Sequence, residues 1–156
     1  MACSILQGGE RSKATRCPCY SHRVDDRLTH AVEILRNALP GVRLVYLFGS
    51  QAKDRARADS DVDLAVLCSS PQQPPALFEL AQRLASLLAC DVDLVDLARA
   101  STVMKKEIVA GGRTLYEQSP ATRHAFEGQV LSAYARLNEE RRPILERIRR
   151  EGRVHG

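Results

Sequence analysis

The sequence predicts an α/β fold, and three observations support that prediction. Short apolar runs rich in β-forming residues alternate with longer segments whose apolar residues recur at helical spacing. Glycine and proline separate these segments, as they do at turns. The 156 residues suffice for one domain. Leu, Val, Ile and Ala must build its core, because tryptophan is absent and aromatic residues make up only 4%.

Each element can be placed in order along the chain. Four strands are expected, at 42–48, 61–68, 91–97 and 113–116. Helices are expected at 24–39, 75–89, 101–110 and 120–150, and a short one can start at Ser50. Ser119 is the expected N-cap of the last helix and Pro120 its first residue, while Pro143 should kink or split it.

The composition divides the chain into three segments and argues against a membrane-spanning, secreted or zinc-knuckle protein. Residues 1–22 are polar and expected to be poorly ordered, 23–118 form the predicted domain, and 119–156 a C-terminal helical extension. No apolar run could span a bilayer or serve as a secretory signal. Five cysteines do not pair evenly, which favours free thiols in a reducing cytoplasm, and the spacing of Cys17 and Cys19 is not that of a zinc knuckle.

Gly49 and Ser50 follow an apolar strand and precede a short helix. A glycine there lets the backbone approach a phosphate closely, and the Ser50 hydroxyl lies where free helical N–H groups favour anions. A net charge of +4 suits a nucleoside triphosphate, but it argues, with the few aromatic residues, against direct nucleic-acid binding. Alone, the Gly-Ser pair is also what a plain strand-to-helix turn would show.

Carboxylates mark the start of two later strands. Asp61 and Asp63 lie two residues apart, so their side chains share a face of the strand, and Asp93 occupies a similar place in the next apolar run. If the two strands are neighbours, three carboxylates cluster and could hold two divalent cations. Asp91 and Asp96 are instead expected to be solvated at the sheet edge.

These residues together resemble the polymerase β-like nucleotidyltransferases, whose signature is Gly-Ser, ten residues, then Asp-x-Asp. Ser50 and Asp61 are separated by residues 51–60, and Asp93 matches the family's third carboxylate in its Val-Asp-Leu-Val context. Residues 24–116 resemble the minimal branch of that family most clearly. Lys53 replaces the arginine usual in that branch, and Asp54 replaces its glycine.

The resemblance implies a polymerase β-like fold, a small mixed sheet flanked by helices with a long C-terminal helical tail. It implies catalysis by Asp61, Asp63 and Asp93, which would bind two Mg²⁺ ions. Nucleotide-binding roles would fall to the positions that seat and neutralise the triphosphate of ATP: Gly49, Ser50, Lys53, Arg55 and Arg57.

Proteins of the minimal branch commonly act as antitoxins, each with a HEPN-domain RNase toxin. The resemblance therefore implies a cytoplasmic antitoxin that transfers AMP from ATP to a tyrosine of its toxin and forms a hetero-oligomer with it. Two alternatives stay open, a non-catalytic antitoxin that acts by direct binding and a nucleotidyltransferase that modifies a small molecule. The apolar stripe of the last helix can dock a partner or pack on its own domain.

Overall fold

The structure, a computed structural model, describes residues 18–52 and 61–151. The predictions made for residues 1–17, for the loop containing Lys53, Arg55 and Arg57, and for 152–156 lie outside the described residues. The elements, in chain order, are α1 (Pro18–Ala38), β1 (Val42–Phe48), α2 (Gly49–Ala52), β2 (Val62–Cys68), α3 (Pro74–Leu88), β3 (Val92–Asp96), α4 (Thr102–Gly111), β4 (Arg113–Glu117) and α5 (Pro120–Glu151).

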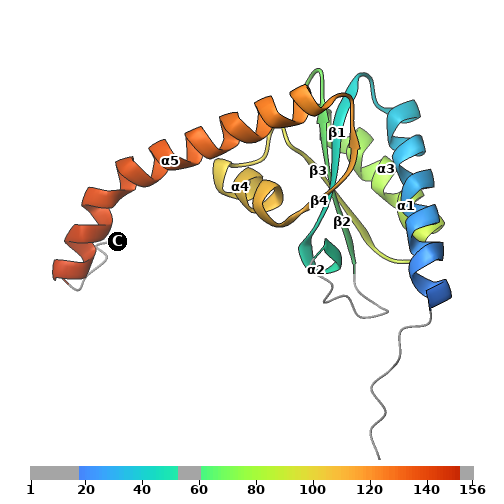
Figure 1. Cartoon of the computed structure of the whole chain (residues 1–156), viewed down its shortest axis with the longest axis horizontal. Helices are drawn as coiled ribbons and strands as arrows, with labels where there is room; N and C mark the ends of the chain where they lie inside the picture. Colours follow the sequence, from blue (N-terminus) through green and yellow to red (C-terminus); the bar gives the residue numbers. More distant parts are fainter. Residues whose placement is uncertain (1–17, 53–60, 152–156) are drawn as a thin grey trace, which may run out of the picture.

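The strands form one four-stranded mixed sheet in the order β3-β2-β1-β4. The β1 strand pairs antiparallel with both β2 and β4, whereas β2 and β3 are parallel. Helices α1 and α3 lie on one side of the sheet, and α4 and the start of α5 lie on the other (Figure 1). The predicted small mixed sheet flanked by helices is confirmed.

A core fills each face of the sheet because the strand residues alternate between the two sides. On the α1 and α3 side, Leu35 and Leu84 pack with Leu64. On the other side, Tyr46 packs with Ile108 of α4 and with Phe126 of α5. The strands β1, β2 and β3 thus carry apolar residues on both faces, as a sheet covered on both sides requires.

The helix α1 differs from its prediction at one end. It begins at Pro18, so residues 18–22, which were expected to be poorly ordered, are helical. From residue 26 onward its buried side chains include Leu28, Ala31 and Leu35, at the predicted spacing. Apolar periodicity could not reveal the first turns, because it marks only the part of a helix that packs on a core.

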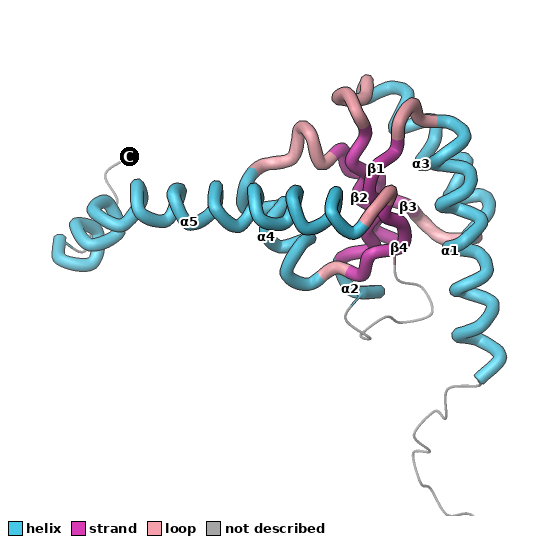
Figure 2. The backbone as a smooth tube through the Cα atoms, turned by 45° about the horizontal axis from the view of Figure 1, so that its top comes forward, coloured by secondary structure: helices cyan, strands magenta, loops and turns pink. Residues whose placement is uncertain are grey.

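The helix α5 is the longest element and leaves the domain as it proceeds (Figure 2). Ser119 caps it as expected, since its Oγ accepts a hydrogen bond from the Thr122 N–H at 3.2 Å. Pro143 does not split the helix, which continues to Glu151 but bends in its last part (Figure 1). No helix within 18–52 and 61–151 has the length and apolar character that crossing a membrane requires.

Candidate active site

Gly49 marks the point where β1 ends and the short helix α2 begins. Its φ is +71°, in the left-handed region that costs a residue with a Cβ about 1–2 kcal/mol. A Cβ built on Gly49 would press against Oδ2 of Asp63 and lie 2.8 Å from its Cγ. Only glycine therefore fits both the turn and the carboxylate beside it. Ser50 follows as an exposed residue of α2.

The sheet brings the predicted carboxylates to one place. Parallel pairing of β2 and β3 sets Asp63 directly beside Asp93, and antiparallel pairing of β1 and β2 sets Asp63 opposite Phe48. Asp61 immediately precedes β2. By alternation Asp63 lies on the face of Ala65 and Leu67, which is the face that α4 and α5 cover.

We call the site formed by Asp61, Asp63 and Asp93 the carboxylate corner. Its negative charges are close enough to affect one another's ionisation. Burial, followed by the nearby charges of Asp93 and Asp61, raises the pKa of Asp63 above its usual value. Asp61 and Asp93 are exposed, whereas Asp63 is partly buried between them and Gly49. Like charges at such a site disfavour ionisation of the innermost carboxyl unless a cation offsets them.

Carboxylate oxygens are the ligands that Mg²⁺ prefers, so the donor set at this corner fits a hard divalent cation. Within the described ranges, however, no three His, Cys, Asp or Glu side chains form a compact metal cluster. The fold thus brings Asp61, Asp63 and Asp93 near one another, but their side chains do not converge on a single metal position. Their assignment to catalysis and metal binding stays a prediction.

Asp91 and Asp96, the other acidic residues of the β3 segment, lie in different environments. Asp91 is exposed, as expected. The expectation for Asp96 is wrong, because it is only 5% exposed. Its Oδ2 accepts a hydrogen bond from the Gln72 N–H at 2.8 Å, and its Oδ1 accepts one from the Ala98 N–H at 2.8 Å. Asp96 closes the turn after β3 and ties it to the loop before α3, a turn chemistry common for aspartate.

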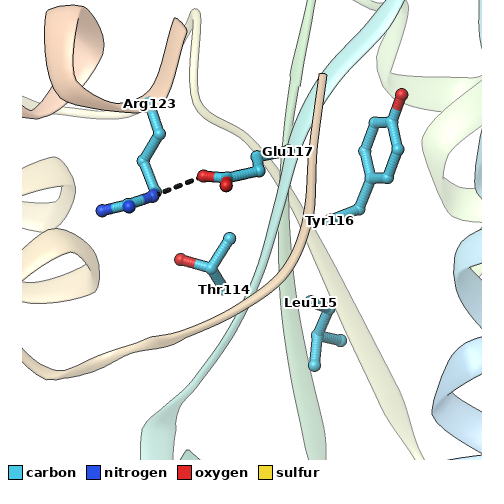
Figure 3. A pocket seen from close by; sticks show the side chains of 5 residues that line it. All are labelled: Thr114, Leu115, Tyr116, Glu117 and Arg123. Atoms are coloured by element: carbon cyan, nitrogen blue, oxygen red, sulfur yellow. Dashed lines mark hydrogen bonds and ion pairs between the residues drawn. The ribbon is translucent and has the colours of Figure 1, made fainter. Parts of the chain in front are cut away.

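A second polar cluster joins α5 to the sheet. Arg123 donates from Nε to Glu117 Oε2 at 2.5 Å and also pairs with Glu127, while the Tyr46 hydroxyl donates to Glu127 Oε1 at 3.1 Å. A hollow beside this cluster is lined by Thr114, Leu115, Tyr116, Glu117 and Arg123 (Figure 3). None of the predicted catalytic residues lines that hollow, so it is separate from the carboxylate corner.

Comparison with known proteins identifies the class. Residues 30–121 match the family model described as Polymerase beta, Nucleotidyltransferase, and this range includes Gly49, Ser50, Asp61, Asp63 and Asp93. The match spans more than half of the chain, and the chain therefore belongs to the polymerase β-type nucleotidyltransferases. It is an enzyme of the nucleotidyl-transfer class, as the resemblance implied.

Individual relatives narrow the class further. The chain is 38% identical over 117 residues to the protein adenylyltransferase MntA of Shewanella oneidensis, which covers 75% of this chain and 84% of that protein. It is 26% identical over 124 residues to the protein adenylyltransferase MntA of Aphanizomenon flos-aquae, covering 73% of this chain and 83% of the relative.

Solved structures agree with these relatives. A toxin–antitoxin crystal structure with AMP-PNP superposes with a TM-score of 0.72 at 36% identity, over 80% of this chain and 97% of that one. A structure of the tri-AMPylated Shewanella oneidensis HEPN toxin in complex with its MNT antitoxin gives a TM-score of 0.68 at 35% identity, over 81% of this chain and 97% of that one.

Proposed function

We propose that this chain is a Mg²⁺-dependent protein adenylyltransferase that acts as an antitoxin, transferring AMP from ATP to a tyrosine of a cognate HEPN RNase toxin. The observation that carries the proposal is the corner where Asp63 lies beside Asp93 on neighbouring strands and against Gly49. Relatives named as protein adenylyltransferases support the reaction, and the relative crystallised with AMP-PNP supports an adenine nucleotide.

The nucleotide would enter at the Gly49–Ser50 turn. The absence of a side chain at Gly49 leaves room for a phosphate beside the backbone, and the exposed Ser50 hydroxyl can donate to a phosphate oxygen. Lys53, Arg55 and Arg57 stand in the sequence directly after this turn, and we assign them the neutralisation of the triphosphate.

Asp61 and Asp63 would hold two Mg²⁺ ions, and Asp93 would complete the site nearest the acceptor. When bound, the ions supply charge neutralisation at the phosphates and lower the pKa of the acceptor hydroxyl. The raised pKa of Asp63, caused by burial and by the charges of Asp93 and Asp61, fits a site that needs a cation to ionise fully.

The residues of the chain then position the transfer. Asp93 accepts the proton of the tyrosine hydroxyl on a carboxylate oxygen. The freed oxygen forms a bond to the α-phosphorus of ATP in line with the bond from that phosphorus to the bridging oxygen, which breaks. Pyrophosphate leaves with the electrons of that bond, and AMP remains on the tyrosine. Positioning and charge neutralisation account for most of the acceleration in such a mechanism.

The test uses the 156-residue chain, α-³²P-labelled ATP, Mg²⁺ and its cognate HEPN protein. We expect label on the HEPN protein, lost on addition of EDTA, and transfer by Asp63→Asn reduced at least about 1,000-fold. Asp91→Asn is the matched control, since it removes an exposed carboxylate directly before the neighbouring strand β3 and should retain transfer.

Two results would overturn this proposal. Full transfer by Asp63→Asn would remove the carboxylate corner from the mechanism. Tight binding of the HEPN protein without label under any nucleotide would identify an antitoxin that neutralises by contact alone.

A further inference from the structure

One face of α5 is apolar along most of the helix, and we call this face the seam. The seam extends beyond the part of α5 that packs on the domain. Phe126 packs in the core beneath α5, and Val130 is only 4% exposed. The same face of the helix then carries Leu137, Ile144 and Ile148, at the spacings of four and seven that keep residues on one helical face. Val130 is thus buried, Leu137 and Ile148 are half-buried and Ile144 is exposed, so the second part of this face is not fully covered.

The uncovered part forms an arm, which we define as residues 135–151. The main contacts of α5 within the described chain are to α4, β1 and β4, and they include Phe126 and Tyr134, which precede the arm. Both views show the arm extending away from the sheet (Figures 1 and 2). Ile144 is 57% exposed and Leu145 is 52% exposed. Adjacent branched apolar side chains exposed to this degree are typical of a surface that a partner covers.

Helix physics gives a second reason to expect a partner. A helical segment of this length is marginal in water without tertiary contacts, because most helical stability in proteins comes from packing of the apolar face. The ion pair of Arg142 with Glu146, at 4.0 Å, joins two exposed side chains of the arm and contributes little. A covering surface would supply the missing stabilisation.

The charge of the arm indicates the kind of surface that fits. Residues 135–151 contain six arginines and four glutamates, a net charge of +2. A second copy of the arm would bring two such positive segments together, which is unfavourable. An apolar groove or helix face bordered by carboxylates would instead match both the seam and the arginines beside it.

The side of the domain from which the arm departs connects it to the chemistry. Asp63 and Asp93 lie on the sheet face that α4 and α5 cover, because they alternate in phase with Ala65 and Val95 of that core. A partner held by the arm is therefore on the same side as the carboxylate corner.

We propose that the arm is the docking surface for the acidic-rimmed apolar face of the HEPN toxin, and that it holds the toxin while the carboxylate corner modifies it. This inference rests on the proposed function for the identity of the partner. The arm supplies affinity, and the carboxylates supply the reaction.

The test measures binding and transfer separately, with the 156-residue chain and its cognate HEPN protein. Ile144→Glu/Leu145→Glu places one charge on the seam and one beside it, at side chains exposed enough that the fold should survive. Gln82→Glu/Arg83→Gln is the matched control, since it changes the net charge by the same amount at exposed residues of α3, outside the arm. Circular dichroism and ATP binding verify that both variants are folded.

We expect the dissociation constant for the HEPN protein to rise at least about 100-fold in the seam variant and less than about fivefold in the control. Transfer by the seam variant should fall at low HEPN concentration and recover at saturating concentration. Unchanged binding by the folded seam variant would overturn the inference. So would a wild-type dimer that this variant converts to a monomer without loss of HEPN binding, because the arm would then serve self-association.

The two proposals fail in different ways. If wild type binds the HEPN protein through the arm but transfers no label, docking stands and the enzymatic proposal fails. If wild type transfers label and the seam variant binds equally well, the enzymatic proposal stands and docking by the arm fails.

Discussion

Replacing Gly49 by alanine is the sharpest test of the carboxylate corner. The left-handed φ of +71° costs an alanine about 1–2 kcal/mol. The new Cβ would also lie 2.8 Å from Cγ of Asp63, whereas ordinary contact begins near 3.4 Å. Since Oδ2 lies closer still, the carboxylate must move by at least roughly 0.6 Å, and displacements of about 1 Å at a reacting centre cost up to about 100-fold in rate.

We expect Gly49→Ala to lose about 1–2 kcal/mol of unfolding free energy and about 10- to 100-fold in AMP transfer. Urea denaturation followed by circular dichroism measures the first quantity, and steady-state labelling from α-³²P-ATP measures the second. Transfer must be measured well below the denaturation midpoint, so that the folded fraction is the same for every variant.

Two other glycines separate backbone strain from disturbance of the site. Gly41 has a φ of +63° and would place its Cβ against Ser69, at the opposite end of β1, so Gly41→Ala should lose similar stability but keep transfer. A Cβ at Gly128 meets nothing within 4 Å, and Gly128→Ala within α5 should gain about 0.5–1 kcal/mol. The reasoning is refuted if Gly49→Ala keeps transfer within about twofold of wild type, or if Gly41→Ala loses as much transfer as Gly49→Ala.

Three further predictions concern stability, each measured by urea denaturation. Asp96→Ala leaves the buried Gln72 N–H without its acceptor and should cost about 2–4 kcal/mol; a cost below about 0.5 kcal/mol would show that the carboxylate is dispensable. Tyr46→Phe removes the hydroxyl bond to Glu127 and should cost about 1 kcal/mol, which a silent substitution would contradict. Ala89→Gly relieves a φ of 55° at the C-cap of α3 and should gain about 0.5–1 kcal/mol, so any loss there would refute the strain.

Much of the fold was predictable because the apolar pattern and the turn residues of each segment match the burial that the structure shows. The strand β1 was placed correctly at Val42–Phe48, since its apolar run is bounded by Gly41 and Gly49. The buried face of α3 likewise follows the spacing of its leucines. The start of α1 was not predictable, because residues 18–22 carry no apolar period that marks a packed face.

The catalytic candidates were readable from spacing, whereas Asp96 was not. Its place two residues before the Ala98 N–H is a local signal for a turn. Its burial, however, depends on the loop that carries Gln72, and that loop lies 24 positions away in the sequence. A carboxylate in an apolar run can be solvated or enclosed, and only the long-range packing decides which.

The sequence by itself determined the alternation of strands and helices, the Gly-Ser turn and the acidic residues that follow it, because these depend on neighbours along the chain. Only the tertiary structure decided that β3 lies parallel to β2 in the register that sets Asp93 beside Asp63. Only the tertiary structure also decided where along α5 the seam stops packing on the domain. Strand order and helix direction depend on how both faces of the sheet are covered. That covering involves residues far apart in the sequence, so the spacing of neighbouring residues does not reveal it.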